Sequence, residues 1–411
     1  MAPGVATYAV HVNREKSTEA AFSQAGKDLK ARMPSGRADL VAVFATGHHG
    51  DADDENVAAI SAAITSLRKE LGHPTLIGCV GESVIGGAEE LEHETGLTVW
   101  CASLPGERIE AVRMQFGQVS EEAYAFTGWP DGLPPEAEKP AMILLADPYS
   151  FPVDELLKQI NLRTPWVPIV GGMASGGAER GDSRLFLDDA VHKDGAVGVV
   201  VSGPIEVRTV VSQGCRPIGK TYVVTKAEDN VIQELGGKPA LVQVTEMIGT
   251  LSPEEKRLVR RSLHVGRVIS ENREKFAHGD FLVRNVMGVD QDKGSIAISD
   301  YVRRGMTIQF HVRDAGTADA DLKKLLARER VEIPANSAGG ALLFSCNGRG
   351  TNLFPAPNHD VGAVREELGS IPVAGFFAAG EIGPVGGKNF LHGFTASVAL
   401  FCEKGAEAGA S

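Results

Sequence analysis

The stretch Thr75-Leu76-Ile77-Gly78-Cys79-Val80-Gly81-Glu82 is an apolar run of strand length that ends in a glycine turn. Before it, apolar residues recur at steps of three and four, which places them on one face of a helix: Val57, Ile60, Ile64, Leu67 and Leu71. Apolar runs at 40–44 and 97–101 flank this pair of elements. The sequence therefore predicts a unit of strand, helix, strand and strand.

The same order of elements occurs twice more. The second copy comprises 142–146, 153–160, 167–172 and 195–201, and the third comprises 341–346, 361–368, 373–381 and 394–401. The third copy again ends its second strand in a Gly-Glu pair, so we expect Glu82 and Glu381 to occupy equivalent places. Any α/β protein alternates strands and helices, so chance similarity is the alternative to true repetition.

The predicted fold class is α/β (mixed α+β), with two domains of mixed β-sheets flanked by helices and built from repeated β-α-β-β units. A strand-helix-strand connection is expected to be a parallel crossover, and the third strand of each unit is expected to be antiparallel. A length of 411 residues suits two domains, which we place at 30–220 and 221–402. Between the second and third copies we expect two helices and three antiparallel strands, at 240–251, 253–263, 281–289, 296–300 and 306–312.

Composition excludes several classes of partner. The formal charge is -12 and no Lys/Arg cluster offsets it, so we expect no nucleic acid. No apolar stretch approaches the roughly 20 residues that cross a bilayer, and the N-terminus does not resemble a signal peptide. Five scattered cysteines without a CxxC pair are typical of reduced thiols, so we expect a cytoplasmic protein without disulfides. We expect no cofactor and no metal, and we interpret His48-His49 with Asp51, Asp53 and Asp54 as the start of a helix.

Six stretches in order resemble the FIST family, the sensory domains named for F-box and intracellular signal transduction proteins. They are residues 77–82, 211–219, 281–290, 346–350, 375–383 and 389–395, and the resemblance spans about 39–401. It implies FIST N and FIST C domains that bind small ligands, possibly amino acids, in signalling proteins. Val80 departs from the small hydroxyl residue of that turn in the family. No F-box, kinase, cyclase or receptor segment is attached, so any output is expected to pass through a separate signalling protein.

Cys346-Asn347-Gly348-Arg349-Gly350 directly follows an apolar strand. Its glycines allow backbone amides to face a ligand, and Arg349 offers a fork to a carboxylate or phosphate. Glu381 ends the neighbouring strand, where open α/β sheets usually bind ligands, and could hold an amine. The alternatives are a simple turn with a surface arginine, and a Glu381 that pairs with an arginine for structural reasons.

Other candidate ligand-binding residues are less specific. His392 and Asn389 lie in a short segment that enters the last strand, where a histidine is often structural. Arg284 and Asn285 interrupt an apolar strand. A buried arginine is costly unless it is paired, so Arg284 either bonds Asp290 or an acid such as Glu381, or anchors a ligand.

We therefore predict an intracellular sensory protein that binds a small anionic or zwitterionic metabolite such as an amino acid. The first alternative is an enzyme with Cys346 as nucleophile and His392 as base. Because no thiol-enzyme signature surrounds Cys346, we expect its size and position, and not its reactivity, to serve the site. The second alternative is an adaptor that recruits proteins through an exposed apolar patch.

Overall fold

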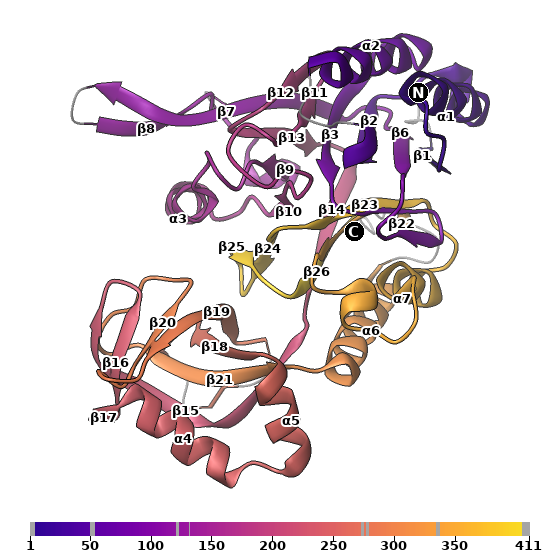
Figure 1. Ribbon diagram of the computed structural model, residues 1–411. Coiled ribbons are helices and arrows are strands. Elements are labelled where there is room, and N and C mark those ends of the chain that lie inside the picture. The colour runs from indigo at the N-terminus through magenta and orange to yellow at the C-terminus, as the bar shows by residue number, and fades with distance from the viewer. Residues whose placement is uncertain are drawn as a thin grey trace, which may run out of the picture. The chain divides into compact units, whose positions relative to one another are not determined.

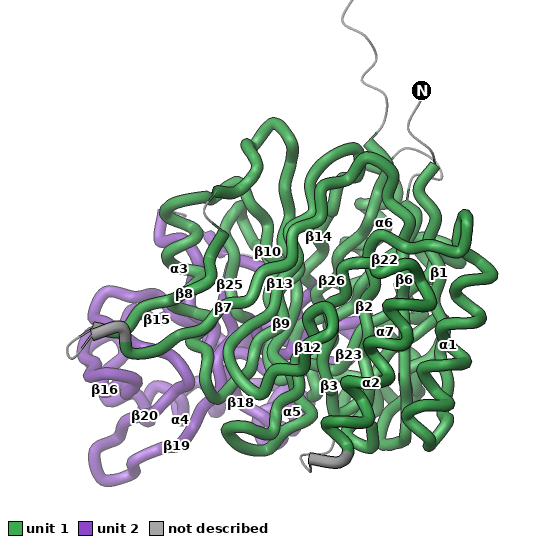
Figure 2. The backbone as a smooth tube through the Cα atoms, turned by 90° about the horizontal axis from the view of Figure 1, so that it is seen from above, with its two compact units in different colours: residues 1–211, 322–391, 395–411 green, residues 212–321, 392–394 purple. Residues whose placement is uncertain are grey.

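Figure 1 shows the computed structural model, which describes residues 5–49, 54–120, 123–130, 132–272, 275–276, 279–333 and 338–404. The chain forms two compact units, coloured separately in Figure 2. Unit 1 comprises residues 1–211, 322–391 and 395–411, and unit 2 comprises 212–321 and 392–394. The mixed α/β class is confirmed. In the described part of the chain, no helix is long and apolar enough to span a membrane.

Unit 1 contains the three copies of the repeated unit, except for the end of β14, the start of α6 and the last residue of β25, which fall in unit 2. The first consists of β1 (Thr7–Asn13), α1 (Thr18–Arg32), β2 (Leu40–Thr46), α2 (Asp54–Glu70), β3 (Thr75–Gly81), β4 (Val84–Gly86), β5 (Glu89–Leu91) and β6 (Leu97–Ser103). The second consists of β7 (Arg108–Ser120), β8 (Ala123–Thr127), β9 (Ala141–Ala146), α3 (Val153–Arg163), β10 (Ile169–Met173), β11 (Leu185–Leu187), β12 (Ala190–His192) and β13 (Ala196–Ser202). The third consists of β14 (Ile205–Gln213), α6 (Ala315–Glu332), β22 (Ala338–Cys346), α7 (His359–Leu368), β23 (Val373–Ala378), β24 (Glu381–Val385), β25 (Lys388–His392) and β26 (Thr395–Glu403).

The three sheets of unit 1 share one topology. Their strand orders are β1-β6-β2-β3-β11-β12, β25-β24-β10-β9-β13-β7-β8 and β14-β26-β22-β23-β4-β5. In each sheet, the two strands on either side of the predicted helix pair in parallel: β2 with β3, β9 with β10 and β22 with β23. The last strand of each copy, β6, β13 or β26, is antiparallel, as predicted. It pairs with the strand before the helix (β2, β9 or β22) and not with the strand after it.

Each copy donates a hairpin to a neighbouring copy. The hairpin β4–β5 of the first copy extends the third sheet, β11–β12 of the second extends the first, and β24–β25 of the third extends the second. Three equivalent backbone bonds begin these pairings: Val80 N–H to Arg184 O at 2.9 Å, Met173 N–H to Gly380 O at 2.8 Å, and Phe377 N–H to Ser83 O at 3.0 Å. Unit 1 is therefore a cyclic arrangement of three repeats, which confirms the predicted repetition.

A glycine at the centre of each second strand explains how the parallel strands approach so closely. A Cβ on Gly78, Gly171 or Gly375 would lie 2.1, 1.8 or 1.7 Å from the carbonyl oxygen of the residue paired with it. No side chain fits at such a distance, so the repeat requires glycine at all three places.

The predicted equivalence of Glu82 and Glu381 is wrong by two residues. Ile85 and Ile382 occupy equivalent places, because each pairs with the central glycine of a neighbouring copy. Glu381 directly precedes Ile382, whereas Glu82 lies three residues before Ile85. The residue equivalent to Glu381 is therefore Val84. The two Gly-Glu pairs are similar in sequence but differ in register.

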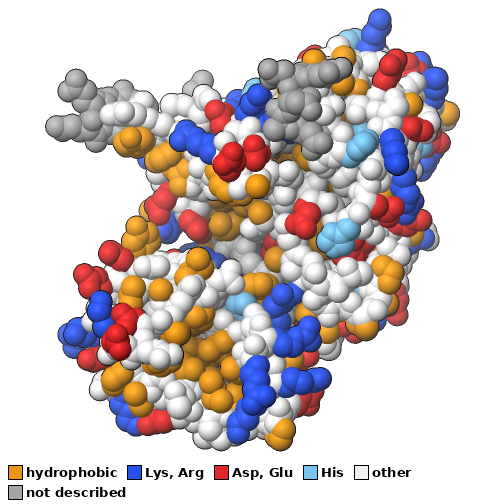
Figure 3. All heavy atoms as spheres, in the orientation of Figure 1, with side chains coloured by type: hydrophobic (Ala, Val, Ile, Leu, Met, Phe, Trp, Pro, Cys, Tyr) orange, Lys and Arg blue, Asp and Glu red, His pale blue; other side chains and the backbone are white. Residues whose placement is uncertain are grey.

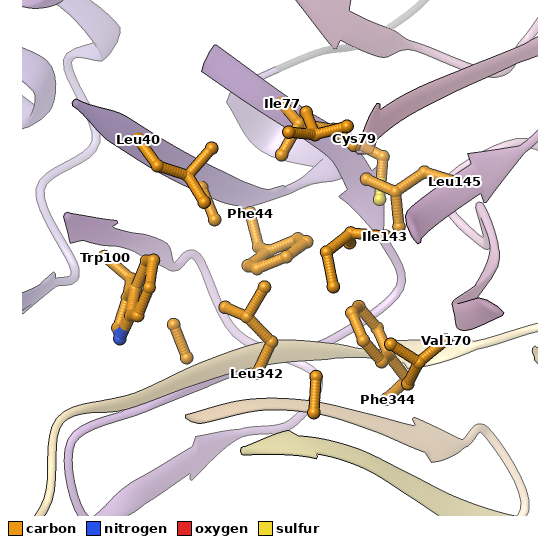
Figure 4. Close-up of a cluster of buried hydrophobic side chains, with 14 of the residues drawn as sticks. Leu40, Phe44, Ile77, Cys79, Trp100, Ile143, Leu145, Val170, Leu342 and Phe344 are labelled. Carbon is orange, nitrogen blue, oxygen red and sulfur yellow. The ribbon is translucent and has the colours of Figure 1, made fainter. Parts of the chain in front are cut away.

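Equivalent side chains from the three copies form the central core. Phe44, Leu145 and Phe344 follow the residues paired with the central glycines, and all three are fully buried. Figure 4 shows them directed toward one another with further strand residues. Phe44 and Phe344 meet edge to face, with ring centroids 6.3 Å apart. The cluster draws buried residues from all three copies, so its burial holds the copies together.

Unit 2 is inserted between β14 and α6. It comprises β15 (Cys215–Glu228), β16 (Val231–Leu235), β17 (Lys238–Pro239), α4 (Ala240–Thr250), α5 (Pro253–Arg261), β18 (Leu263–Val268), β19 (Phe281–Asp290), β20 (Ser295–Ile298) and β21 (Thr307–Arg313). The strand order β15-β21-β18-β19-β20-β16 closes through pairing of β16 with β15. The two helices and three strands predicted here are present, and Ser252 caps α5 in a capping box with Glu255.

Figure 3 shows hydrophobic side chains among charged ones on the visible face of the molecule. In unit 2, large hydrophobic side chains are exposed on β15, α4, β19 and the segment after β20: Val223, Val242, Met287, Val289 and Tyr301. The adaptor alternative would use these side chains, and it stays a prediction. The division of the chain at 220/221 also stays a prediction about sequence domains, since the compact units divide the chain differently.

Candidate functional site

The Cys346 loop begins where β22 ends, at the carboxyl edge of the third sheet. Arg349 N–H returns to Cys346 O at 2.7 Å, which closes a tight turn. Gly350 follows with φ of +54°, and a Cβ there would lie 2.5 Å from a carboxylate oxygen of Glu92. Glu92 also accepts the backbone N–H of Thr351. The loop is thus fixed by its own backbone and by an acid from the first copy.

Arg349 is held in a buried ion pair. Its Nε and Nη2 donate to the two carboxylate oxygens of Asp360 at 2.7 and 2.8 Å, and neither side chain is exposed. Ser345 and His359 also contact this carboxylate, at 2.6 and 2.8 Å. Burial would raise the pKa of Asp360, but the charge and hydrogen bonds of Arg349 lower it strongly. The surface-arginine alternative is wrong.

Arg349 still has an unused donor. Its Nη1 is buried and has no hydrogen-bond partner among the described residues. The ring of Phe354 lies 5.2 Å from the guanidinium carbon, so one face of the group is covered by an aromatic ring. A ligand acceptor could therefore satisfy Nη1 without breaking the ion pair.

Glu381 begins β24 beside the Cys346 loop and is fully buried. Its Oε2 accepts from the backbone N–H and the hydroxyl of Thr395, at 3.0 and 2.7 Å. Its Oε1 has no hydrogen-bond partner in the described part of the chain. Burial raises the pKa of Glu381 to about 8, although hydrogen bonds from Thr395 and Cys346 and the charge of Arg349 act in the opposite direction.

A third carboxyl, Glu90, reaches the network from the hairpin of the first copy. Its Oε1 accepts the N–H groups of Asp360 and Val361 at 2.8 and 2.9 Å, at the start of α7. Burial, and then the charge of Asp360, raise the pKa of Glu90 to about 7. The network therefore holds three buried carboxyls beside the guanidinium of Arg349, and the pKa values of two of them lie near or above neutrality.

The structure brings three of the predicted site residues together. Cys346, Arg349 and Glu381 interact electrostatically, since Cys346 and Glu381 both raise the pKa of Arg349 against the effect of burial. Cys346 is partly exposed, whereas Arg349 and Glu381 are not. Cys346 is thus the most accessible of the three side chains.

Asn389 lies in unit 1 and serves the packing of β25. Its side chain accepts from Ile169 N–H at 2.8 Å and donates to Val167 O at 2.9 Å. Its backbone exchanges two hydrogen bonds with Asn161, both at 2.8 Å. These bonds tie β25 to the second copy and use both ends of the amide, which accounts for Asn389 structurally.

The remaining predicted residues belong to unit 2. Arg284 bonds Asp300 at 3.1 Å, so the predicted pairing exists, although the acid is neither Asp290 nor Glu381. Asn285 is exposed, and its side chain contacts His264. His392 ends β25 and is buried within the segment 392–394. Their roles in ligand binding stay predictions.

Sequence reasoning missed Asp360, Glu90 and Ser345. Asp360 opens a helix, so its pattern indicates a capping acid. Glu90 follows a glycine pair on a strand of three residues, which is too short to show periodicity. Ser345 precedes Cys346 inside an apolar strand. A hydroxyl among apolar residues needs a hydrogen-bond partner, and this was the one sequence signal that could have pointed to the buried network.

A metal centre finds no support in the described residues, where no group of three or more His, Cys, Asp and Glu could hold an ion. Of the acidic stretch after His48-His49, Asp51 and Asp53 lie outside the described residues. His49 is buried and contacts Thr18 at 3.1 Å.

Comparison with known proteins identifies the family. The FIST N domain model matches residues 39–238 and the FIST C domain model matches 240–384. The chain belongs to the FIST family, whose domains are associated with signal transduction and small-ligand sensing.

The relatives are similar along their whole length. An uncharacterized protein of Mycobacterium tuberculosis (strain CDC 1551 / Oshkosh) is 41% identical over 96% of this chain and 99% of its own. An uncharacterized protein of Mycobacterium bovis is 41% identical over 95% of this chain and 96% of its own. Among solved structures, cyanuric acid hydrolase from A. caulinodans covers 98% of this chain and 100% of its own, with 11% identity and a TM-score of 0.33. A likeness this low supports no statement about function.

Proposed function

We propose that this protein is a cytoplasmic sensory protein that binds a small zwitterionic metabolite, such as an amino acid, beside Cys346. One observation carries the proposal. Two fully buried side chains of opposite charge type, Arg349 and Glu381, each have a polar atom without a partner among the described residues. An unsatisfied buried group costs about 1–3 kcal/mol, so a ligand that satisfies both atoms recovers free energy from both.

The chemistry of the two atoms selects the ligand. Nη1 of Arg349 is a donor and suits a carboxylate, while Oε1 of Glu381 suits an ammonium group. Asp360 already neutralises Arg349, so a purely anionic ligand would gain little charge attraction. An ammonium group would also favour the ionised form of Glu381 and would release its proton. A zwitterion therefore fits better than an anion within the predicted class.

The cytoplasmic location and a separate signalling partner are part of the proposal. All five cysteines are free thiols, which supports a reducing compartment. The FIST association with signal transduction supports a partner that reads the bound state.

Matched probes test the ligand class. Alanine carries both charged groups, propionate lacks the ammonium, and ethylamine lacks the carboxylate. We expect at least one standard amino acid at millimolar concentration to raise the melting temperature, and binding at 100 times the Kd would add about 2.7 kcal/mol of stability. The deaminated analogue of that amino acid should have a much smaller effect.

Two variants locate the site. Glu381→Gln keeps the shape of the side chain but cannot hold an ammonium as a counter-ion, so the stabilisation should be lost. Glu329→Gln changes an acid that bonds Arg208 at 2.6 Å, away from the network, and should leave it unchanged. The proposal fails if no amino acid stabilises the protein, or if the deaminated analogue stabilises it equally.

A further inference from the structure

Cys346 differs from the other cysteines in its surroundings. All five lie in the described part of the chain, where four are buried and Cys346 is partly exposed. The N–H of Gly348 donates to its sulfur at 3.4 Å. The guanidinium of Arg349 is close enough to interact electrostatically with the thiolate. A backbone donor, a nearby cation and partial exposure are the conditions under which a thiol becomes reactive.

The side chain next to the thiol, Glu381, becomes a proton acceptor once it has ionised. Cys346 interacts with the Glu381 carboxyl, and Oε1 of that carboxyl has no hydrogen-bond partner among the described residues. Oε2 is fixed by Thr395, so the carboxyl cannot easily turn away. Glu381 can therefore take the thiol proton without leaving its place in β24.

The other charged groups of the network do not compete for this proton. Asp360, on α7, is bound to Arg349 and stays ionised, which the lowered pKa of its carboxyl shows. Glu90, on β5, contacts the start of α7 and not the thiol. Cys346 and Glu381 are thus the pair between which we expect the proton to move.

We infer that Cys346 is a modification site, at which a small hydroperoxide oxidises the thiol while Glu381 carries the proton. The sulfur loses its proton to the Glu381 carboxylate and attacks one oxygen of the peroxide. The O–O bond breaks as the S–O bond forms. Glu381 returns the proton to the leaving oxygen, so hydrogen peroxide yields a sulfenic acid and water. Sulfur is oxidised by two electrons and the peroxide is reduced by two.

Oxidation would change the ligand site, because it adds an oxygen to the side chain that interacts with both Arg349 and Glu381. The inference shares its location with the proposed function, but it needs no bound ligand. A protein that binds no amino acid could still show it, and so the two can fail separately.

The experiment uses the full chain treated with hydrogen peroxide in the presence of dimedone, which traps sulfenic acids. Peptide mass spectrometry then measures the adduct at each of the five cysteines. We expect one adduct, at Cys346, with a rate above that of free cysteine. The rate should rise through pH about 8, the value for the Glu381 carboxyl, since the pair loses one proton there.

Glu381→Gln removes the acceptor. Above pH 8, where Glu381 is ionised in the natural protein, the rate of the variant should be about tenfold lower, which corresponds to one unit of thiol pKa, and the rise in rate near pH 8 should be lost. Cys346→Ser should give no adduct, and Glu329→Gln should react like the natural protein. An adduct rate at Cys346 no greater than that of free cysteine overturns the inference, and so does an unchanged pH profile in Glu381→Gln.

Discussion

Replacement of Glu381 by glutamine should stabilise the folded protein at neutral pH, although it alters a fully buried hydrogen-bonded residue. The pKa of Glu381 is raised in the folded state from its ordinary 4.5 to about 8, chiefly by burial. Between these values the folded state holds a proton that the unfolded chain has lost. The free energy of unfolding therefore falls as pH rises through this window, by about 1.4 kcal/mol per unit.

The magnitude at pH 7 follows from the width of the window. From the ordinary pKa of 4.5 up to pH 7, the natural protein loses about 3 kcal/mol through Glu381. Glutamine never ionises, and its oxygen can still accept both bonds from Thr395. Glu381→Gln should therefore match the natural protein near pH 4.5 and exceed its stability by about 3 kcal/mol at pH 7. Above pH 8 the difference should become constant.

Urea unfolding followed by tryptophan fluorescence measures this difference, because Trp100, Trp129 and Trp166 all lie in unit 1. Glu90 also has a raised pKa, so some pH dependence should remain in the variant. Glu329→Gln is the matched control. It should lower the free energy of unfolding slightly, and by a similar amount at every pH in this range. If the difference between the natural protein and Glu381→Gln is the same at pH 5 and pH 8, Glu381 is not a neutral buried acid.

Two further pairs of variants test the fold and the ion pair. Gly375→Ala should prevent correct folding of unit 1, because its Cβ would lie 1.7 Å from the carbonyl oxygen of Leu343. Gly362→Ala, with open space around it in α7, should stabilise the protein by up to about 1 kcal/mol. Circular dichroism and thermal melting compare the two variants. Arg349→Met should cost about 3–5 kcal/mol, because it leaves a carboxylate buried and unpaired. Arg208→Met should cost much less, since Arg208 is a quarter exposed and its acids can turn to water; equal losses in urea unfolding would contradict this view.

The repeated unit was predictable because two independent sequence patterns mark it, one for its helix and one for its strands. Helical spacing at Ile60, Ile64 and Leu67 and the apolar runs on either side identify the elements without reference to tertiary structure. The cyclic exchange of hairpins was not predictable. Strands such as β4 and β11 are only three residues long, and their partners lie in other copies, so no local pattern encodes the pairing.

The candidate site was predictable in position and less so in chemistry. Cys346 and Arg349 follow one strand and Glu381 follows the next, so parallel pairing brings them to one edge. The sequence does not show that Arg349 is neutralised by Asp360, which lies eleven residues later at the start of a helix. Burial raises the pKa of Glu381, and no local sequence pattern shows how deeply that side chain is buried.

Comparison of the three copies shows why the third one carries the site. Register places Thr46, Asp147 and Cys346 at equivalent strand ends. Asp147 accepts hydroxyl protons from Ser150 and Ser183 at 2.5 and 2.6 Å, so both of its oxygens are satisfied. Thr46 exchanges hydrogen bonds with the backbone of Gly96. In these copies the strand end is closed by its own bonds.

The third copy departs from this pattern at one further place. The residue equivalent to Gly96 is Thr395, which bonds Glu381 and so brings a carboxyl into the strand end. A glycine there would keep the backbone N–H donor and lose the hydroxyl donor, so it would leave the acid with one bond in place of two. The three copies thus have similar strand ends, and Thr395 with the buried Glu381 makes the strand end of the third copy chemically reactive. The same reasoning predicts that Thr395→Gly, which loses the hydroxyl bond to the carboxylate and keeps the backbone one, would raise the pKa of Glu381 further and extend the pH dependence of the stability gain of Glu381→Gln to higher pH.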